Sequence, residues 1–510
     1  MSTLELRGDA LRLEDVELVA AGGGPLVILA RAARERIEAA RAVVEQAVAE
    51  ERAVYGITTG FGALAEVSIP AARIRELQLN LIRSHAGGVG DPLPVPEVRA
   101  VTLLRANVLA LGYSGVRPVV VERLLDLLNC GIHPVIPALG SVGASGDLAP
   151  LSHLALVLLG EGEAWVGERC MPGREALELA GLEPLVLEAK EGLALNNGTQ
   201  VHTGIGILAL LRAERALETE EVAGAMSLEG LRGTPDAFDP LIQRARPHPG
   251  QAISAGRLRG LLQSSEVRES HRYGDPRVQD AYSLRCMPQV HGAARQALGY
   301  VRSVLEVEAN SATDNPLIFA DKQRIISGGN FHGQLVAQAL DLLAIVCADL
   351  GAISERRIAR LVDPALSGLP AFLTRDPGVN SGLMMTQIVA AALVAALRLR
   401  SMPASSDHIP TDNHREDHVS MGMTAALKAR AAVGLLEWVL ALELLTAAQA
   451  LEFLLPLRPG RGVEEAWRRV RAAVPPLANV RVLAPDIAAV EWLVRSGGFA
   501  TLWSEFPAPS

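Results

Sequence analysis

The segment "GSVGASGDLAP" (residues 140–150) places three small residues where the backbone itself could become a reagent. If the chain bends tightly, the amide nitrogen of Gly146 can attack the carbonyl carbon of Ala144, because glycine has no Cβ in the way. Ser145 lies between them and can lose its hydroxyl as water. Ring closure with loss of two waters would give a conjugated ring with an exocyclic methylene, which is an electrophile. The competing interpretation is a small-residue loop capped by Asp147 at a helix start.

Other recognisable catalytic apparatus is missing from the sequence. We find no P-loop, no Rossmann glycine motif after a strand, no HExxH and no GxSxG elbow. Lysine occurs only at positions 190, 322 and 428, so a Schiff base with pyridoxal phosphate has just three candidates. The four cysteines lack zinc-site spacing, which is typical of a reduced, cytoplasmic protein. We therefore expect no metal, pyridoxal phosphate or nucleotide.

The composition indicates a large globular chain that forms oligomers. Of 510 residues, 49% are hydrophobic and 21% charged, with a net charge of −9 and no long basic block, so nucleic acid is not an expected partner. The start, "MSTLELRGDALRLEDVELV", has no apolar core and is not expected to be a signal peptide. Apolar runs interrupted by Asp341 and Asp349 predict buried core helices rather than membrane spans. The apolar surplus predicts subunit contacts.

Apolar periodicity predicts a mainly α fold, with a long central helical bundle and small β elements near the active-site end. Helices are expected at 29–53, 72–84, 96–111, 117–130, 148–159, 335–350, 379–399 and 421–453. Strands are expected at "EAWVG" and "EPLVLE", and a hairpin at "PLIFA" and "RIIS". The later helices are apolar nearly all round, as in the centre of a bundle. We expect an N-terminal domain (1–205) that carries the Ala-Ser-Gly loop, followed by the bundle and C-terminal helices (206–510).

Ten segments, in order, resemble the histidine/phenylalanine/tyrosine ammonia-lyase family. They are "YGITTGFG", "NLIRSHAGGVG", "GSVGASGDLAPLSHLAL", "KEGLALNNGTQ", "VQDAYSLRCMPQVHG", "TDNPLIF", "SGGNFHG", "SERRIARLVDP", "GVNSGLMMTQ" and "REDHVSMG". The similarity is close over residues 55–422. It implies a 4-methylideneimidazol-5-one ring made autocatalytically from Ala144-Ser145-Gly146. It also implies a cytoplasmic homotetramer with shared active sites and an amino acid substrate.

The resemblance assigns roles to individual residues. Tyr55 becomes the base that removes the substrate β-proton, for which its pKa should be lowered by positive charge or helix ends. Arg285 would grip the substrate carboxylate, although a structural ion pair is an equal alternative from sequence alone. The other residues implied in the site are Tyr282, Gln279, Asn197 and Phe331, with 313–315 as support. His153, His291 and His332 are expected to be structural.

Two positions bear on the substrate. His85 and Glu416 resemble the histidine-specific members, and both can hydrogen-bond an imidazole, whereas beside a phenyl ring they would be buried without partners. Four residues depart from that pattern: Thr58, Asn196, His414 and Arg415. Arg415 could pair with Glu416 and compete for its charge. We predict deamination of L-histidine to urocanate and ammonia.

Three alternatives stay open. The first is a phenylalanine or tyrosine ammonia-lyase, or an aminomutase, with the same ring. The second is the fumarase/aspartase class, whose "GSSxMPxKxN" loop is not in this sequence. The third is a helical scaffold without activity, against which the intact Ala-Ser-Gly, Tyr55 and Arg285 argue.

Overall fold

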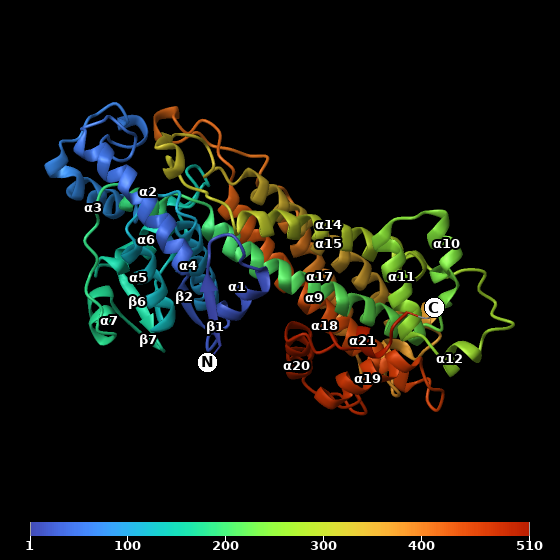
Figure 1. Cartoon of the computed structure of the whole chain (residues 1–510). Coiled ribbons are helices and arrows are strands. Elements are labelled where there is room, and N and C mark those ends of the chain that lie inside the picture. Colours follow the sequence, from blue (N-terminus) through green and yellow to red (C-terminus); the bar gives the residue numbers. More distant parts are fainter. Residues whose placement is uncertain (1, 509–510) are drawn as a thin grey trace. The chain divides into compact units, whose positions relative to one another are not determined.

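The computed structural model describes residues 2–508 (Figure 1). The chain folds into two compact units. Unit 1 comprises residues 1–208, 301–341 and 403–427, and unit 2 comprises 209–300, 342–402 and 428–510. The chain first enters unit 2 inside a helix, just after Leu208. The domain boundary expected near residue 205 remains a prediction about independent folding, which this division does not test.

Unit 1 combines short helices with small sheets. Its helices are α1 (Leu13–Ala20), α2 (Arg31–Ala49), α3 (Ile74–His85), α4 (Val95–Ala110), α5 (Pro118–Asn129), α6 (Leu148–Leu158), α7 (Gly173–Leu179) and α8 (Glu191–Asn196). Its strands are β1 (Thr3–Leu6), β2 (Leu26–Leu29), β3 (Val89–Pro92), β4 (Ile132–Pro134), β5 (Pro137–Leu139), β6 (Glu163–Val166), β7 (Arg169–Pro172), β8 (Leu317–Phe319) and β9 (Arg324–Ile326). The pair β1–β2 is parallel, while β3–β5, β4–β6–β7 and β8–β9 are antiparallel.

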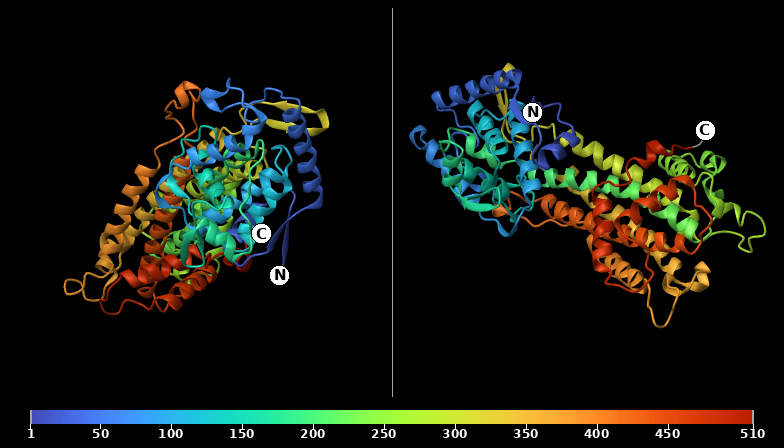
Figure 2. Two further views of the ribbon diagram at one scale, coloured as in Figure 1. Left: turned by 90° about the vertical axis from the view of Figure 1, so that its left-hand side faces the viewer. Right: turned by 90° about the horizontal axis from the view of Figure 1, so that it is seen from below.

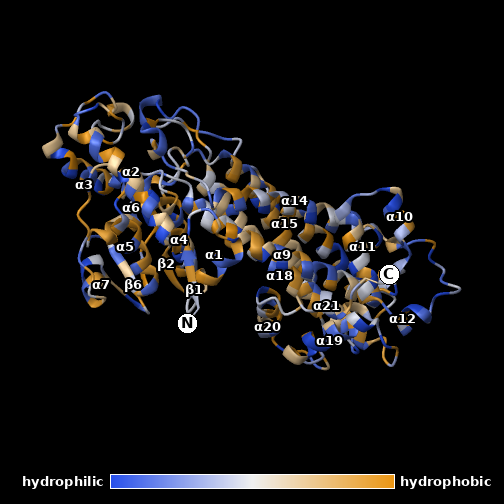
Figure 3. Cartoon of the chain, in the orientation of Figure 1, coloured by the Kyte–Doolittle hydropathy of each residue, from blue (hydrophilic) through white to orange (hydrophobic). Residues whose placement is uncertain are grey.

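Four long helices have residues in both units: α9 (Gln200–Gly230), α14 (Met287–Glu308), α15 (Gln334–Val362) and α18 (Gly422–Glu452). Unit 2 adds α10 (Pro240–Ala245), α11 (Pro249–Leu261), α12 (Glu266–Glu269), α13 (Tyr282–Arg285), α16 (Pro364–Ser367), α17 (Met384–Arg400), α19 (Arg461–Ala473), α20 (Ala484–Arg495) and α21 (Leu502–Glu505). Ile358, Ala390 and Leu442 form part of its core. Residues 439–450 of α18 are all buried, as expected for a central bundle helix. Hydrophobic residues, orange in Figure 3, are frequent along these long helices.

The predicted helices are present, and most of their ends lie within about five residues of the prediction. The exception is the helix expected to end at residue 350, which continues to Val362 as α15. Proline at the first turn starts α5, and Gly131, with φ of +70°, follows its end. The β8–β9 hairpin is confirmed, and β8 packs beside α2 (Figure 2). The prediction of a strand at 183–188 is wrong. Leu185 and Leu187 are buried there and Val186 is exposed, so the alternation is real, but no neighbouring strand pairs with this segment.

Within residues 2–508, two helices are long and apolar enough to cross a membrane by length and composition alone. They are α15 and α18, and 61% and 78% of their most apolar windows are buried inside the fold. Burial of this kind is what core helices of a bundle show.

Candidate active site

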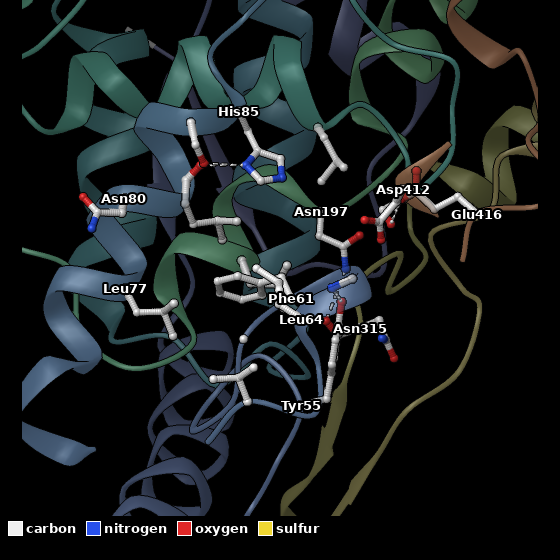
Figure 4. A pocket seen from close by; sticks show the side chains of 18 of the residues that line it. Tyr55, Phe61, Leu64, Leu77, Asn80, His85, Asn197, Asn315, Asp412 and Glu416 are labelled. Atoms are coloured by element: carbon white, nitrogen blue, oxygen red, sulfur yellow. Dashed lines mark hydrogen bonds between the residues drawn. The ribbon is translucent and has the colours of Figure 1, made fainter. Parts of the chain in front are cut away.

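A cavity of about 640 Å³ in unit 1 gathers six of the predicted site residues (Figure 4). Tyr55, His85, Ser145, Asn197, Phe331 and Glu416 line it, together with Phe61, Leu64, Leu77, Asn80, Leu81, Asn315 and Asp412. These residues come from segments up to 361 positions apart in sequence (Tyr55 to Glu416). One wall is apolar, while amide, carboxylate and imidazole groups gather elsewhere, as expected of a small-molecule site.

The Ala-Ser-Gly segment is held as a tight bend. Gly146 has φ of +74°, and a Cβ at this position would lie only 2.1 Å from the carbonyl oxygen of Gly198, so only glycine fits. The Gly198 N–H donates to Ser145 O at 3.2 Å, and its carbonyl accepts from Asp147 N at 2.7 Å. Ala144 is buried, and α6 begins directly afterwards at Leu148. The bend therefore consists of small residues, and the backbone of Gly198 packs closely against it.

Asp147 does not cap α6 as the alternative interpretation of this loop expected. It occupies the N-cap position, but its side chain makes no hydrogen bond to that helix. Instead, its carboxylate accepts from the N–H groups of Val201 and His202 at 2.9 and 3.0 Å, and contacts His202 Nδ1. Asp147 thus ties the Ala-Ser-Gly bend to the start of α9.

Tyr55 opens a loop, residues 55–69, which we call the Tyr55 loop. Its two ends are anchored in one apolar cluster, through Ile57 on one side and Ile69 on the other, together with Val44 and Ile318. Between the anchors, Thr59 and Ser68 form a single antiparallel bridge, and the tip projects outward. Leu64, at the tip, has 65% of its surface exposed although it lines the cavity.

The Tyr55 hydroxyl accepts a hydrogen bond from Gly62 N at 3.3 Å. Burial raises the pKa of Tyr55, the Gly62 contact lowers it, and the carboxylates of Asp412 and Glu416 raise it further. The expectation that positive charge or helix ends lower this pKa is therefore wrong for the isolated chain. Neither supplies a compensating effect, and the charges that act on the phenol are both negative.

Residues 411–416 form a second structural unit of the site, which we call the 411–416 turn. Thr411 and Glu416 close it through backbone bonds in both directions and a bond from Thr411 Oγ1 to Glu416 Oε2. Asp412, Asn413 and His414 have φ values of +48°, +52° and +63°. Asp, Asn and His are the non-glycine residues that best tolerate this left-handed region. The turn places Glu416 Oε1 3.2 Å from Ser145 Oγ, which donates to it.

His85 lies at the end of α3, and its Nδ1 lies 2.9 Å from Leu81 O and 3.0 Å from Ser84 Oγ. If Nδ1 carries the proton for the carbonyl, Nε2 is left as an acceptor. No other residue in the described part of the chain bonds to Nε2. His85 can therefore offer a polar contact to a bound molecule.

Asn197 is held in a fixed orientation. Its Nδ2 donates to Asp314 Oδ1 at 3.1 Å and to Asn315 O at 3.2 Å, and Asp314 in turn accepts from the buried Lys190 at 2.8 Å. The Asn197 side chain is 2% exposed, and its Oδ1 has no hydrogen-bond partner within the structure. A buried acceptor without a donor is costly unless a ligand supplies one. The expected support from 313–315 is thus present.

Gln279, Tyr282 and Arg285 do not line this cavity. They lie in unit 2, where α13 carries Tyr282 and Arg285. The Arg285 guanidinium lies 4.6 Å from the centre of the Tyr282 ring, and its Nε has no hydrogen-bond partner in residues 2–508. Tyr282 is 71% exposed. The structural ion pair that was the alternative for Arg285 is not found among the described residues.

The residues that depart from the histidine-type pattern lie off the cavity. Thr58 accepts from Val54 N at 2.9 Å and donates to Arg52 O, so its hydroxyl shapes the loop. Asn196 Nδ2 donates to Ser152 Oγ in α6 at 3.1 Å. His414 and Arg415 are exposed, and no hydrogen bond or ion pair joins Arg415 to Glu416 in the described structure. The expected competition for the Glu416 charge is not found.

Two of the histidines that were expected to be structural have clear hydrogen-bond partners. His153 Nε2 accepts from Gly88 N at 3.1 Å, and burial lowers the pKa of His153. His332 Nε2 lies 3.1 Å from His418 O. Sequence reasoning missed Asp412, which accepts from Ala63 N at 3.0 Å. The sequence does contain a signal for this residue: Asp412-Asn413-His414 is a run suited to a left-handed turn, two residues before Glu416.

Comparisons with known proteins agree on the family. The family model for aromatic amino acid lyases matches residues 11–472. The chain is 56% identical to a histidine ammonia-lyase of Anaeromyxobacter sp. (strain K), over 98% of this chain and 99% of that one. The solved histidine ammonia-lyase of Trypanosoma cruzi has a TM-score of 0.92 at 44% identity, covering 99% of this chain and 96% of that chain. A tyrosine aminomutase of Streptomyces globisporus has a TM-score of 0.93 at 37% identity, covering 100% and 99%.

Proposed function

The chain belongs to the aromatic amino acid lyase family, and on that premise we propose that it releases ammonia from L-histidine and leaves urocanate. The observation that carries this proposal is the pair His85 and Glu416, which face one cavity together with Tyr55 and Ser145. An imidazole N–H can donate to Glu416. A phenyl ring in its place would leave buried polar groups without partners.

We propose that Ala144, Ser145 and Gly146 form the methylideneimidazolone ring. The left-handed Gly146, where a Cβ would clash, the buried Ala144 and the unpartnered Asn197 Oδ1 support the fit of such a group. The ring supplies an electrophile that activates the amino acid. No metal, nucleotide or pyridoxal phosphate is needed for the chemistry proposed here.

The chain's own side chains remove the proton and bind the substrate. Tyr55, as phenolate, takes the β-proton, and the amino group leaves as ammonia, so that an α,β-unsaturated acid remains. Glu416 and His85 hold the side chain, Asn197 accepts a hydrogen bond, and Phe331 closes the cavity wall. Arg285 holds the carboxylate through two parallel N–H···O bonds.

We propose that Gln279, Tyr282 and Arg285 reach the cavity from another copy of the chain in a homotetramer. The exposure of Gln279 and Tyr282 and the unpartnered Arg285 Nε support this arrangement. The positive charge of Arg285 would then lower the pKa of Tyr55, which is raised in a single chain. The free cysteines, without a disulfide in residues 2–508, support a cytoplasmic location.

The decisive experiment is product analysis of the purified protein with histidine, phenylalanine and tyrosine, combined with its intact mass. We expect urocanate from histidine, little cinnamate or coumarate, and a mass two waters below that of the sequence. Ser145→Ala should lose this mass difference and nearly all turnover. An active protein of unmodified mass would refute the ring.

An aminomutase is the second candidate, because a solved tyrosine aminomutase has nearly the same fold. It would convert an α-amino acid into its β-isomer without net release of ammonia. Chromatography of the same reactions separates the two outcomes. Light scattering tests the assembly, and a fully active monomer would contradict the shared site.

A further inference from the structure

The two acidic residues of the 411–416 turn contact two different parts of the cavity. Glu416 accepts from Ser145 Oγ, whereas Asp412 Oδ2 accepts from Ala63 N in the Tyr55 loop at 3.0 Å. The mechanism above uses Glu416 and leaves Asp412 without a role. We propose that Asp412 is a positioning residue that latches the Tyr55 loop closed over Ser145.

The Asp412 contact leads directly to the proposed base. Ala63 N donates to Asp412, and the preceding N–H, that of Gly62, donates to the Tyr55 hydroxyl. A Cβ at Gly62 would lie 2.1 Å from Asp412 Oδ2, so glycine permits this close approach. Release of Asp412 would therefore free Ala63 and, next to it, Gly62, whose N–H contacts the phenol.

The Tyr55 loop has few other attachments near its tip. The Thr59–Ser68 bridge closes the base of the loop through two backbone bonds, from Gly60 N to Val67 O and from Ile69 N to Thr58 O, each 2.9 Å long. The tip is a single 3-10 turn, Gly62–Leu64, whose backbone-to-backbone bonds stay within the loop. Leu64 and Val67 are 65% and 51% exposed, so apolar burial holds the tip only weakly. Segments with few buried contacts open at low free-energy cost. A single hydrogen bond to a carboxylate can therefore set the closed population.

The 411–416 turn is a firm anchor by comparison. Backbone bonds between Thr411 and Glu416 close it, and Arg415 N donates to Asp412 O at 3.0 Å. Because Asp412 and Glu416 share this turn, one element carries both the contact to the Tyr55 loop and the carboxylate that faces Ser145. The effect of the latch on catalysis rests on the proposed function. The contact between Asp412 and Ala63 does not depend on which substrate is bound.

Hydrogen exchange and kinetics of the full-length protein test the latch with Asp412→Ala and Asp412→Asn. Asparagine can still accept from Ala63 N through its amide oxygen, whereas alanine cannot. For Asp412→Ala we expect exchange across residues 60–64 to rise roughly 10-fold or more, as loss of a hydrogen bond to a charged group predicts. Exchange in α6 should stay unchanged. We expect kcat on histidine to fall by a similar factor, with KM changed less than about 3-fold.

Asp412→Asn should restore most of the protection and most of kcat. The matched control is Asp407→Ala, an exposed carboxylate of the same segment with no hydrogen bond to the Tyr55 loop in the described structure. The latch would be overturned if residues 60–64 of Asp412→Ala exchanged at the wild-type rate. It would also be overturned if the alanine and asparagine variants showed equal increases in exchange and equal losses of kcat. If the wild-type protein makes no urocanate, the proposed function fails, while the exchange results still decide the latch.

Discussion

Ser145 Oγ donates a hydrogen bond to Glu416 Oε1 at 3.2 Å across 271 residues of sequence. The same carboxylate is held from the other side by Thr411 Oγ1. In the proposed ring formation Ser145 would give up its hydroxyl, and Oε1 would lose this donor and face the cavity as a free acceptor. An imidazole N–H can replace the lost partner, which links the formation of the electrophile to the choice of substrate.

Glu416→Gln and His85→Leu should both lower histidine turnover. Losing a charged hydrogen bond in a dry site costs about 1.5–3 kcal/mol, which corresponds to roughly 10- to 150-fold in rate. Activity on phenylalanine should hold or rise, because a buried polar group without a partner has been removed. Urocanate formation, followed by absorbance, measures the effect, with Asp407→Ala as the control. Unchanged histidine turnover in both variants would move the assignment to the phenylalanine or tyrosine enzymes.

Thr58→Asn and Asn196→Leu should leave the preference for histidine over phenylalanine unchanged within about 3-fold, a difference of less than about 1 kcal/mol. Both side chains bond to groups away from the cavity, Thr58 to the backbone of its own loop and Asn196 to Ser152. The ratio of kcat/KM values for the two substrates provides the measurement. A reversal of preference in either variant would show that these positions act on the substrate after all.

The sequence predicted the cavity residues whose roles come from short motifs. Ser145, Asn197 and Glu416 lie in such segments, and they meet in one cavity. Asp412 could not be predicted, because its partner Ala63 is 349 residues away and its approach depends on the left-handed turn. The contacts of the Asp147 side chain were hidden for the same reason: in sequence it precedes α6, but its carboxylate bonds to the start of α9.

The helices could be predicted where the periodicity of apolar residues follows the buried face. They were harder to predict where polar residues are also buried. Residues 219–230 of α9 are all buried although they include Glu220 and Glu221, so no apolar stripe marks this helix. Arg357 pairs with Glu220 and Glu443 in the same interior. Such buried networks depend on partners from other helices, which no local pattern reveals.

Arg285→Lys should weaken binding of the substrate carboxylate and alter the pH profile only slightly, because the charge remains but the two parallel bonds are lost. We expect KM for histidine to rise roughly 10-fold or more, the change expected when a charged hydrogen bond is lost. Arg285→Met removes the charge as well. If Arg285 of a neighbouring copy lowers the Tyr55 pKa, the rise of kcat/KM with pH should move to higher pH in this variant. An Arg285→Met profile that matches the wild type would contradict a charge contact between these residues.

Glu229→Gln should change how stability depends on pH. Glu229 is buried in unit 2 and accepts from Gly460 N at 2.8 Å, and burial raises its pKa to about 7. Because a carboxylic acid with a raised folded-state pKa binds more protons folded than unfolded, its contribution to stability falls as the pH rises from about 4.5 to about 7. Above pH 7 the ionised wild-type residue should cost roughly 3 kcal/mol relative to its neutral form. Glutamine keeps the acceptor for Gly460 and cannot ionise, so the variant should be more stable than wild type at pH 8 and equally stable at pH 4.5. Urea unfolding at the two pH values measures this difference. A stability difference that does not change between them would show that Glu229 ionises normally in the folded protein.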